Sequence, residues 1–391
     1  MLEAEQFPPV KNGKLLFLGY FYPPNSLMMK KSILVTISLA ALFSLGAYSQ
    51  ERNIEELIQE GVELHDAGEY EEAIDRYLEV LETDSTSLLA IYELSLSYLA
   101  LKDFENALEY STRVIDSGDE RLSPGAYAAK SEALAEMDHV DDAIELLQEG
   151  LSKHGDEYLL HFNMALNYYK KGDTDNTLKH VKRAIDMDKT HSGAFLLYAY
   201  VLNDKGRWVQ SILAMQMFLL LEPDSRRSKN AFEELLQTMQ IRKRTEPVER
   251  SFIQQQMMRN QPETALHADE IPPLSTEEGL NRNLVYHAIT TTLDSLKAGT
   301  GEEDEVSEFV LFKAVNKAII DVLERESLKS EAGIFWTFYV PFFSQIAQSG
   351  YYDTFCRYVS VSYYPESLEW WQQNPDAAVN FVMWFEKGDD T

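Results

Sequence analysis

Apolar residues recur along the middle of the chain at the three- and four-residue spacing of amphipathic helices. In the first such stretch, Leu57, Gly61 and Leu64 share one helix face, and Ala73 and Tyr77 begin the apolar stripe of the next stretch. Short polar segments separate one apolar stripe from the next. The pattern predicts pairs of antiparallel helices joined by tight connections.

The helix pairs repeat with a nearly constant period. The turn segment that runs from Ala67 to Ile74 returns four times in weakened form. Each copy carries one small residue at the same point, with spacings of 34, 36, 34 and 34: Ala73, Ala107, Ala143, Thr177 and Ser211. A small residue there lets the second helix approach the first closely. Gly68, Gly172 and Gly206 are expected to end the first helix in the left-handed conformation.

These marks resemble the tetratricopeptide repeat (TPR) family. The first helix of each pair has a small residue at a fixed place: Gly61, Ser95, Ser131, Ala165 and Ala199. An aromatic follows the turn in three copies, at Tyr70, Phe104 and Trp208, and Pro223 ends the last copy. The third copy departs from the pattern with Asp138 and Val140, and the fourth with Thr174.

The resemblance implies an α-solenoid of five tetratricopeptide-like helix pairs. The apolar stripes that follow predict a capping helix and a second all-α, aromatic-rich domain, so the fold class is all-α. The expected segments are repeats 54–87, 88–121, 124–157, 158–191 and 192–225, a capping helix 228–240 that completes an array over 54–240, a helix end and linker 241–274, and a C-terminal domain 275–391. Such arrays present an extended concave surface to partners.

The resemblance also implies that the first helix of each pair lines the concave surface. The candidate partner-binding residues are Tyr92, Leu96, Phe162, Asn163, Tyr169, Tyr200 and Asn203. The charged residues there are the acids Asp66, Glu93, Glu132, Glu136 and Asp204, with Lys170 nearly alone as a base. This composition is unlike the family's carboxylate clamps and favours a protein or peptide partner with apolar and basic side chains. The alternative is that several of the aromatics belong to the core between repeats.

The N-terminal segment has the layout of a secretory signal peptide. Lys30 and Lys31 precede an apolar run of about a dozen residues, and a small-residue cleavage site ends at Ser49 with Gln50 as the new N-terminus. We expect residues 1–28 to be an upstream extension and residues 29–49 to be the signal peptide, so that the protein is exported to the periplasm, the cell envelope or the medium.

The C-terminal region is rich in aromatic residues and contains Trp336, Trp370, Trp371 and Trp384, four of the five tryptophans. Most of these rings are expected in a core. An exposed aromatic cleft among them would make the chain a carbohydrate- or envelope-binding protein, which is the alternative to a peptide-binding scaffold. The apolar stretch 334–347 is too short to span a membrane and is expected to be a buried helix.

Charge and motifs narrow the class of function. The formal net charge is −29, which argues against nucleic acid as a general partner. The charge is uneven, with −22 over residues 51–160, +5 over 161–260 and −14 over 261–391. No zinc-binding His-Glu-x-x-His, nucleophile elbow or Walker loop occurs in the sequence, and its single Cys excludes a disulfide framework. The sequence therefore predicts an exported interaction scaffold without catalysis, metal or cofactor.

Overall fold

The computed structural model describes residues 54–242, 280–298, 306–327 and 334–387. Within these ranges the regular elements are helices, which confirms the all-α class. The expected upstream extension, signal peptide with its cleavage site at Ser49 and Gln50, and most of the linker lie outside the described ranges.

Five antiparallel helix pairs form the array, as the repeat period predicts. They are α1 (Ile54–Ala67) with α2 (Tyr70–Thr83), α3 (Leu88–Ala100) with α4 (Phe104–Ser117), α5 (Ser123–Glu136) with α6 (Val140–His154), α7 (Tyr158–Lys171) with α8 (Thr174–Met187), and α9 (Ser192–Asp204) with α10 (Trp208–Leu221). A further helix, α11 (Arg226–Thr238), follows.

The turn inside every pair has one geometry. Gly68, Gly172 and Gly206 have positive φ angles, as expected, but Lys102 (φ 64°) and Asp138 (φ 65°) adopt the same left-handed conformation. In each turn two backbone N–H groups donate to the end of the preceding helix, for example from Gly68 to the carbonyl of His65. This is a Schellman ending, and it satisfies carbonyls that a helix end leaves free. The turn geometry is therefore kept even where the glycine is lost.

The same ending recurs once more, after α11. Gln240 has a φ of 58°, and its N–H donates to the carbonyl of Gln237 at 3.0 Å. Gln240 lies 34 positions after Gly206, which is the repeat period. The helix expected as a simple cap thus has the geometry of the first half of a sixth repeat.

Small residues set the close approach within each pair. The second-helix positions Ala73, Ala107, Ala143 and Thr177 are all fully buried. In the first pair, a Cβ added at Gly61 would collide with the ring of the buried Tyr77. The glycine and alanine positions of the sequence pattern are therefore packing positions, where a larger side chain would push the helices apart.

The C-terminal region is helical as well. Its elements are α13 (Arg282–Ala298), α14 (Glu308–Ser327), the π-helical turn η2 (Phe335–Tyr339), α15 (Val340–Gln348), α16 (Tyr352–Val359), α17 (Pro365–Gln373) and α18 (Ala377–Lys387). The stretch expected as a buried helix is formed by η2 and α15, where Trp336 and Phe343 are 3% and 1% exposed. None of the described helices is both long and apolar enough to cross a bilayer.

One apolar core joins the array to the C-terminal region. A single cluster of buried side chains runs from Ala165 in α7 to Phe381 in α18. At the junction, Phe232 of α11 contacts the ring of Phe312 of α14 with centroids 4.8 Å apart. The amide of Gln216 in α10 donates to Asn316 Oδ1 of α14 at 3.0 Å, and both residues are fully buried. The last two repeats and the C-terminal helices are therefore one packed unit.

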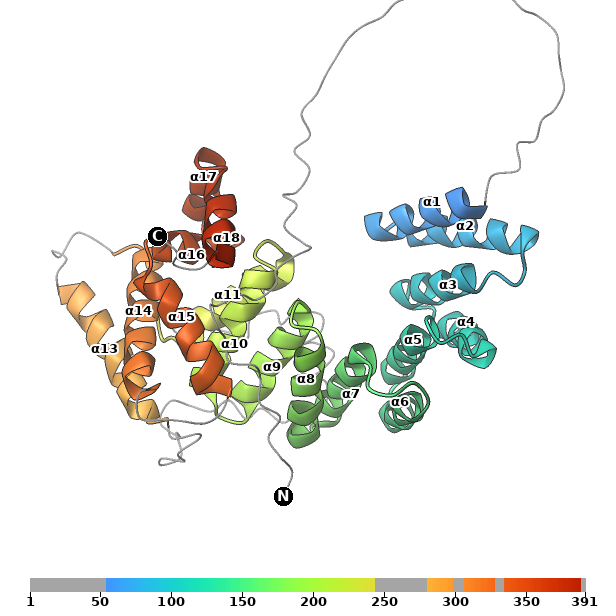
Figure 1. The fold of residues 1–391 in the computed structure, drawn as a ribbon, viewed down its shortest axis with the longest axis horizontal. Helices are drawn as coiled ribbons and strands as arrows, with labels where there is room; N and C mark the ends of the chain where they lie inside the picture. The colour runs from blue at the N-terminus through green and yellow to red at the C-terminus, as the bar shows by residue number, and fades with distance from the viewer. Residues whose placement is uncertain (1–53, 243–279, 299–305, 328–333, 388–391) are drawn as a thin grey trace, which may run out of the picture.

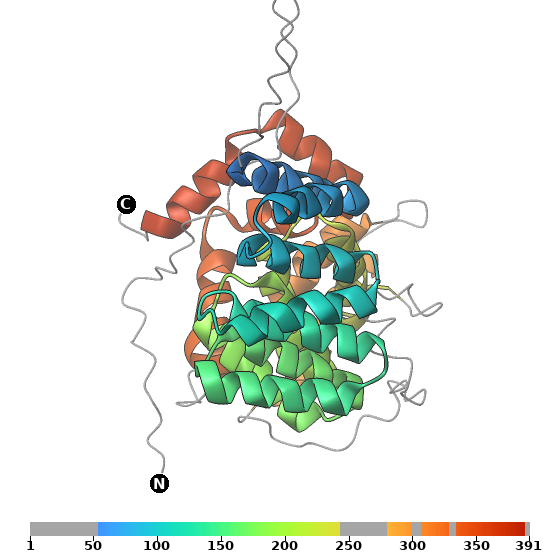
Figure 2. The same cartoon turned by 90° about the vertical axis from the view of Figure 1, so that its right-hand side faces the viewer.

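The described helices form a U in the view of Figure 1, with α1 to α4 in one arm and α11 and α17 in the other. The second helices α4 and α6 lie on the outside of the curve relative to α3 and α5. Seen from the side of α1, the array is a stack that descends from α1 to α8 (Figure 2). The first helices α1, α3, α5 and α7 thus line the inside of the curve.

A buried histidine pair holds the fourth repeat together. His161 Nδ1 of α7 and His180 Nδ1 of α8 are 2.9 Å apart, and the two residues are 8% and 7% exposed. The other ring nitrogen of His161 lies 3.1 Å from Asp156, which also pairs with Arg183. Two nitrogens that share one proton cannot both be protonated at this distance. Burial, with repulsion from His161 and Lys179, lowers the pKa of His180 to about 4.

We predict that this pair makes the array sensitive to acid. The pKa of His180 is lower in the folded state than in the unfolded state, where it is about 6.5. Unfolding therefore takes up a proton below pH 6.5, and roughly 2 kcal/mol of the free energy of unfolding is lost as the pH falls to about 4, after allowance for partial screening by water. Urea unfolding of the full chain between pH 7.5 and 4.5 measures this loss. His180→Gln should flatten the pH dependence, whereas the exposed His139→Gln should not; equal slopes in both variants would contradict the account.

Candidate functional site

The inner face of the array is built from three neighbouring first helices. We define it by the stripes Leu89, Tyr92, Glu93, Leu96 and Leu99 of α3, Gly125, Ala128, Glu132, Ala135 and Glu136 of α5, and Phe162, Leu166 and Lys170 of α7. Within each helix these residues are mostly three or four positions apart, so each stripe shares one side. Side-chain contacts join the stripes across 34 and 35 positions, as the repeat predicts.

Two contacts show how closely the first helices approach. Lys170 Nζ lies 3.7 Å from Glu136 of α5 and donates to the carbonyl oxygen of Ala135. Tyr169 Oη donates to Asp204 Oδ2 of α9 at 2.6 Å. The base that the sequence places on this face is therefore already bound to α5.

The middle stripe consists of small residues and glutamates. A Cβ at Gly125 would collide with the hydroxyl end of Tyr92, so the Tyr92 ring reaches across α5 at this glycine. Ala128 and Ala135 are 8% and 5% exposed, whereas Glu132 keeps contact with solvent from the floor of the curve. The larger side chains of α3 and α7 flank this row, which puts Glu132 between two apolar borders.

The inner face carries two acidic side chains, Glu93 and Glu132, that have no cationic partner among the described residues. The pKa of Glu132 is raised by desolvation from the protein around it and by the nearby Glu136. The pKa of Glu93 is raised by burial and by Asp66 of α1. Neither Glu93 nor Glu132 forms an ion pair within the described part of the chain. The folded protein therefore holds two carboxylates in positions that disfavour their charge.

The predicted concave residues divide into two groups. Tyr92, Leu96 and Phe162 are half-buried and line the inner face, while Asn203 is exposed at the end of α9. The other three predicted residues are buried inside the array. Asn163 is 8% exposed and donates to the carbonyl of Leu159, and Tyr169 and Tyr200 are 3% and 5% exposed. Tyr169 and Tyr200 thus have the environment of the core between repeats, which was the alternative for the aromatics.

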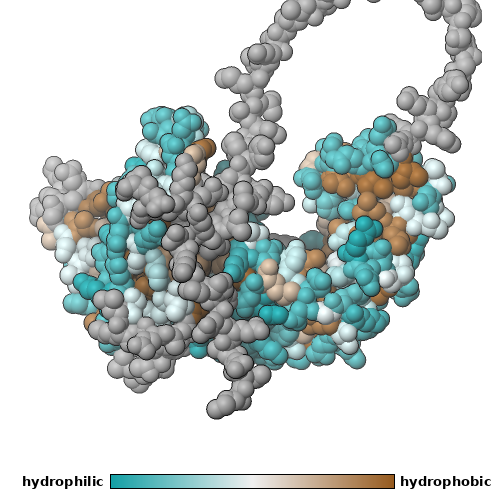
Figure 3. All heavy atoms as spheres, in the orientation of Figure 1, coloured by the Kyte–Doolittle hydropathy of each residue, from teal (hydrophilic) through white to brown (hydrophobic). Residues whose placement is uncertain are grey.

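The inner face ends at the fourth repeat. Residues 193–202 of α9 and 209–220 of α10 are all buried. The ring of Tyr198 in α9 lies 6.5 Å from that of Tyr339 in η2. Packing of the C-terminal region on the last repeats leaves α3, α5 and α7 as the first helices with free surface on both sides of a small-residue row. Figure 3 shows the hollow between the two arms of the U.

In the sequence, Glu93 and Glu132 stand out only as charged members of the concave surface. The signal for their setting was present in α5, whose inner stripe reads glycine, alanine, glutamate and alanine at helical spacing. Because most of these side chains are short, such a stripe predicts a shallow groove along α5 between the longer side chains of the neighbouring helices.

The four predicted cleft tryptophans do not share one environment. Trp336 is 3% exposed and belongs to the core. Trp370, Trp371 and Trp384 are half-buried, and Arg357 lies over the Trp370 ring at 5.3 Å. Exposed apolar side chains occur near them on α17 and α18, at Leu368, Val379 and Met383. Trp336 therefore cannot line an open cleft, whereas the other three border the surface.

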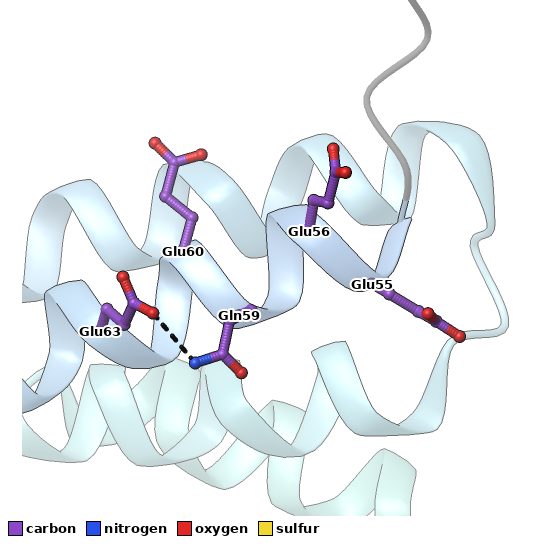
Figure 4. Close-up of a pocket in the computed structure, with 5 residues that line it drawn as sticks. All are labelled: Glu55, Glu56, Gln59, Glu60 and Glu63. Atoms are coloured by element: carbon purple, nitrogen blue, oxygen red, sulfur yellow. Dashed lines mark hydrogen bonds between the residues drawn. The ribbon is translucent and has the colours of Figure 1, made fainter.

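A second acidic surface lies on α1. Glu55, Glu56, Glu60 and Glu63 surround Gln59, whose amide donates to Glu63 Oε1 at 3.1 Å (Figure 4). All five side chains come from one helix and point to solvent. This surface adds to the negative field of the first repeats without enclosing a ligand.

The described residues include the side chains that could bind a metal or act as a nucleophile. No group of three or more His, Cys, Asp or Glu side chains that could hold a metal occurs among the described residues. Cys356 is fully buried, and burial raises the pKa of its thiol to about 12. A thiol with so high a pKa stays protonated at neutral pH and is a poor nucleophile.

Comparison with known proteins supports the repeat assignment. The family model of the tetratricopeptide repeat matches residues 58–127. This match assigns the tetratricopeptide repeat to the first helix pairs, and the later pairs of the array share their period and turn geometry. No curated protein matches the chain.

Solved structures of TPR proteins are similar to the array. A thermophilic TPR protein of Thermus thermophilus has a TM-score of 0.43 and 18% identity, covering 48% of this chain and 100% of that one. For pilF of Pseudomonas aeruginosa the TM-score is 0.40 and the identity 17%, with 48% and 84% covered. For YrrB, described as a TPR protein with an unusual peptide-binding site, they are 0.31 and 18%, with 45% and 89% covered.

We predict that Gly125 is required for the position of Tyr92. In Gly125→Ala the added methyl group would meet the Tyr92 ring. Overpacking costs about 1–3 kcal/mol, and the better helix propensity of alanine offsets up to about 1 kcal/mol of it. Urea unfolding should show a net loss for Gly125→Ala and none for Gly350→Ala, where nothing lies within 4 Å. Adding Tyr92→Leu should restore stability, and a neutral Gly125→Ala would refute the contact.

Proposed function

We propose that the chain is a protein-interaction scaffold that holds a segment of a partner on the inner face of α3, α5 and α7, without catalysis. One observation carries this proposal. The inner face keeps half-exposed apolar side chains such as Leu96 and Phe162 beside carboxylates that lack cations, whereas the surface of α9 and α10 is covered. Apolar side chains left open next to a rigid curved frame are typical of partner-binding surfaces.

The rigidity of the array favours such a role. The Schellman turns and the buried small residues fix each helix pair, and contacts such as Lys170 with Glu136 fix neighbouring pairs. A preformed surface loses little conformational entropy on binding, so more of the contact energy appears as affinity.

We further propose that the scaffold works outside the cytoplasm, in the periplasm or cell envelope. The support is the sequence alone: two lysines, an apolar run of about a dozen residues and a small-residue site before Gln50. An exported scaffold would meet its partner after removal of residues 1–49.

The alternative function is carbohydrate or envelope binding through the C-terminal region. It draws support from the exposed Leu368, Val379 and Met383 beside the half-buried Trp370 and Trp384. This surface is formed by α17 and α18 and not by α3, α5 and α7, so the two proposals predict different contact sites.

Site-specific photo-crosslinking in the native cells tests the proposal. A photoreactive benzoylphenylalanine is placed at Leu96 or Leu166 on the inner face, at Val379 on α18, or at Glu109 on the outer helix α4. We expect Leu96 and Leu166 to yield the same partner peptide, and Glu109 to yield none. The same mass spectra should contain an N-terminal peptide that starts at Gln50.

Other adduct patterns would contradict specific parts of the proposal. Adducts from Val379 alone would favour the C-terminal alternative. Equal adducts from Glu109 and Leu96 would show that partners do not bind preferentially to the inner face. Peptides from residues 1–49 in the mature protein would argue against export by cleavage.

A further inference from the structure

We infer that the inner face selects a partner segment that carries a lysine or arginine between apolar side chains, with its cationic group held by Glu132. This inference rests on the proposed function, because it specifies the chemistry of the partner at that same surface.

The apolar part of the surface fixes where a segment can lie. The α5 stripe is low because it is made of Gly125, Ala128 and Ala135, while Leu96 of α3 and Leu166 of α7 stand on either side. A chain laid along this row can place side chains towards both borders. The borders are apolar, so apolar side chains of the partner gain by covering them.

Glu132 is the charged group of this row that has no counter-ion. The neighbouring acid Glu136 is engaged by Lys170, which also binds the carbonyl of Ala135. Lys170 is the single base in the stripes that define the inner face, so none of these residues remains to pair with Glu132. Glu132 is exposed to solvent, so an ammonium or guanidinium group of a partner can reach its carboxylate and form a charge-assisted hydrogen bond.

A second acidic position lies along the same face, at the border of α1 and α3. The pKa of Glu93 is raised by burial and by the charge of Asp66. Beside them is Tyr77, which is fully buried and whose hydroxyl has no hydrogen-bond partner among the described residues. Burial raises the pKa of this hydroxyl, and the charges of Glu93 and Asp66 raise it further. A buried hydroxyl without a partner is an incompletely satisfied polar group.

Long-range charge favours the same class of partner. Residues 51–160 carry a net charge of −22, and they include α3 and α5. Such a field attracts a basic segment and repels an acidic one or a free C-terminal carboxylate. Glu132 and Glu93 then determine where the lysine or arginine side chains of the partner bind.

Peptide selection on the full chain tests the inference. A phage library of random 12-residue peptides is panned at low salt, and the affinities of synthetic copies are measured by fluorescence anisotropy. We expect selected peptides to contain lysine or arginine flanked by apolar residues. Replacing that cation with norleucine should weaken binding about tenfold, as loss of a charge-assisted contact does. Binding should also weaken as the pH falls and Glu132 becomes protonated, and as salt is added.

Matched variants separate this inference from a general charge effect. Glu132→Gln should lower affinity about tenfold and Glu93→Gln by less, whereas Glu109→Gln and Glu145→Gln on the outer helices should change it less than about twofold. Glu132→Gln should unfold no more easily than the original chain, because it removes an unfavourable charge. Thermal unfolding of the same samples therefore separates a binding effect from loss of the fold.

Two results would overturn the inference, and they have different consequences. If neutral peptides are selected and Glu132→Gln binds them equally well, the cation requirement is wrong, while crosslinks from Leu96 and Leu166 would still support the scaffold. If no peptide is selected, the inference is also wrong, and the crosslinking pattern alone decides on the proposed function.

Discussion

The structure depends on the burial of α9 and α10 on every side. A helix of a solenoid normally keeps one polar face towards water, because only part of its surface is covered by neighbours. Here residues 209–220 of α10 are all buried, among them Leu213, Met217 and Leu220. A helix with so few polar side chains requires a cover, and α11, α14, η2 and α16 contribute to the cover of α9 and α10. The C-terminal region is therefore a structural requirement of the last repeats.

This constraint also decides where a partner can bind. Covering the last repeats closes the surface of α9, and the same packing leaves the inner face of α3, α5 and α7 open. The buried contact of Gln216 with Asn316 fixes the register of the cover, because a polar pair in an apolar core is costly in any other alignment. The fold thus holds a rigid, acidic and partly apolar surface at one arm and a sealed core at the other.

Most of the array could be read from the sequence, because its rules are local. The period of the small residues indicated the helix pairs, and Gly68, Gly172 and Gly206 marked the left-handed turns. Lys102 and Asp138 were less apparent, since packing of the flanking helices can hold a residue other than glycine in the left-handed region at a modest energetic cost.

The site was harder to predict, because exposure depends on what packs over a helix. Tyr169 and Tyr200 fit the concave pattern as well as Tyr92 does, yet they are buried and Tyr92 is not. The missing signal was in α10, whose polar residues are only two glutamines and a serine and which so already implied a covering domain. Reading that helix as covered would have restricted the binding surface to the earlier repeats.

Native-state hydrogen exchange, followed peptide by peptide at increasing urea, tests the shared core most directly. If α9, α10 and α14 form one cooperative unit, their slowest amides should open with the same free energy and the same dependence on urea. Phe312→Ala should then lower the protection of α10 and α14 together. A separate, lower-energy opening of α14 to α18 that leaves α10 protected would contradict the account.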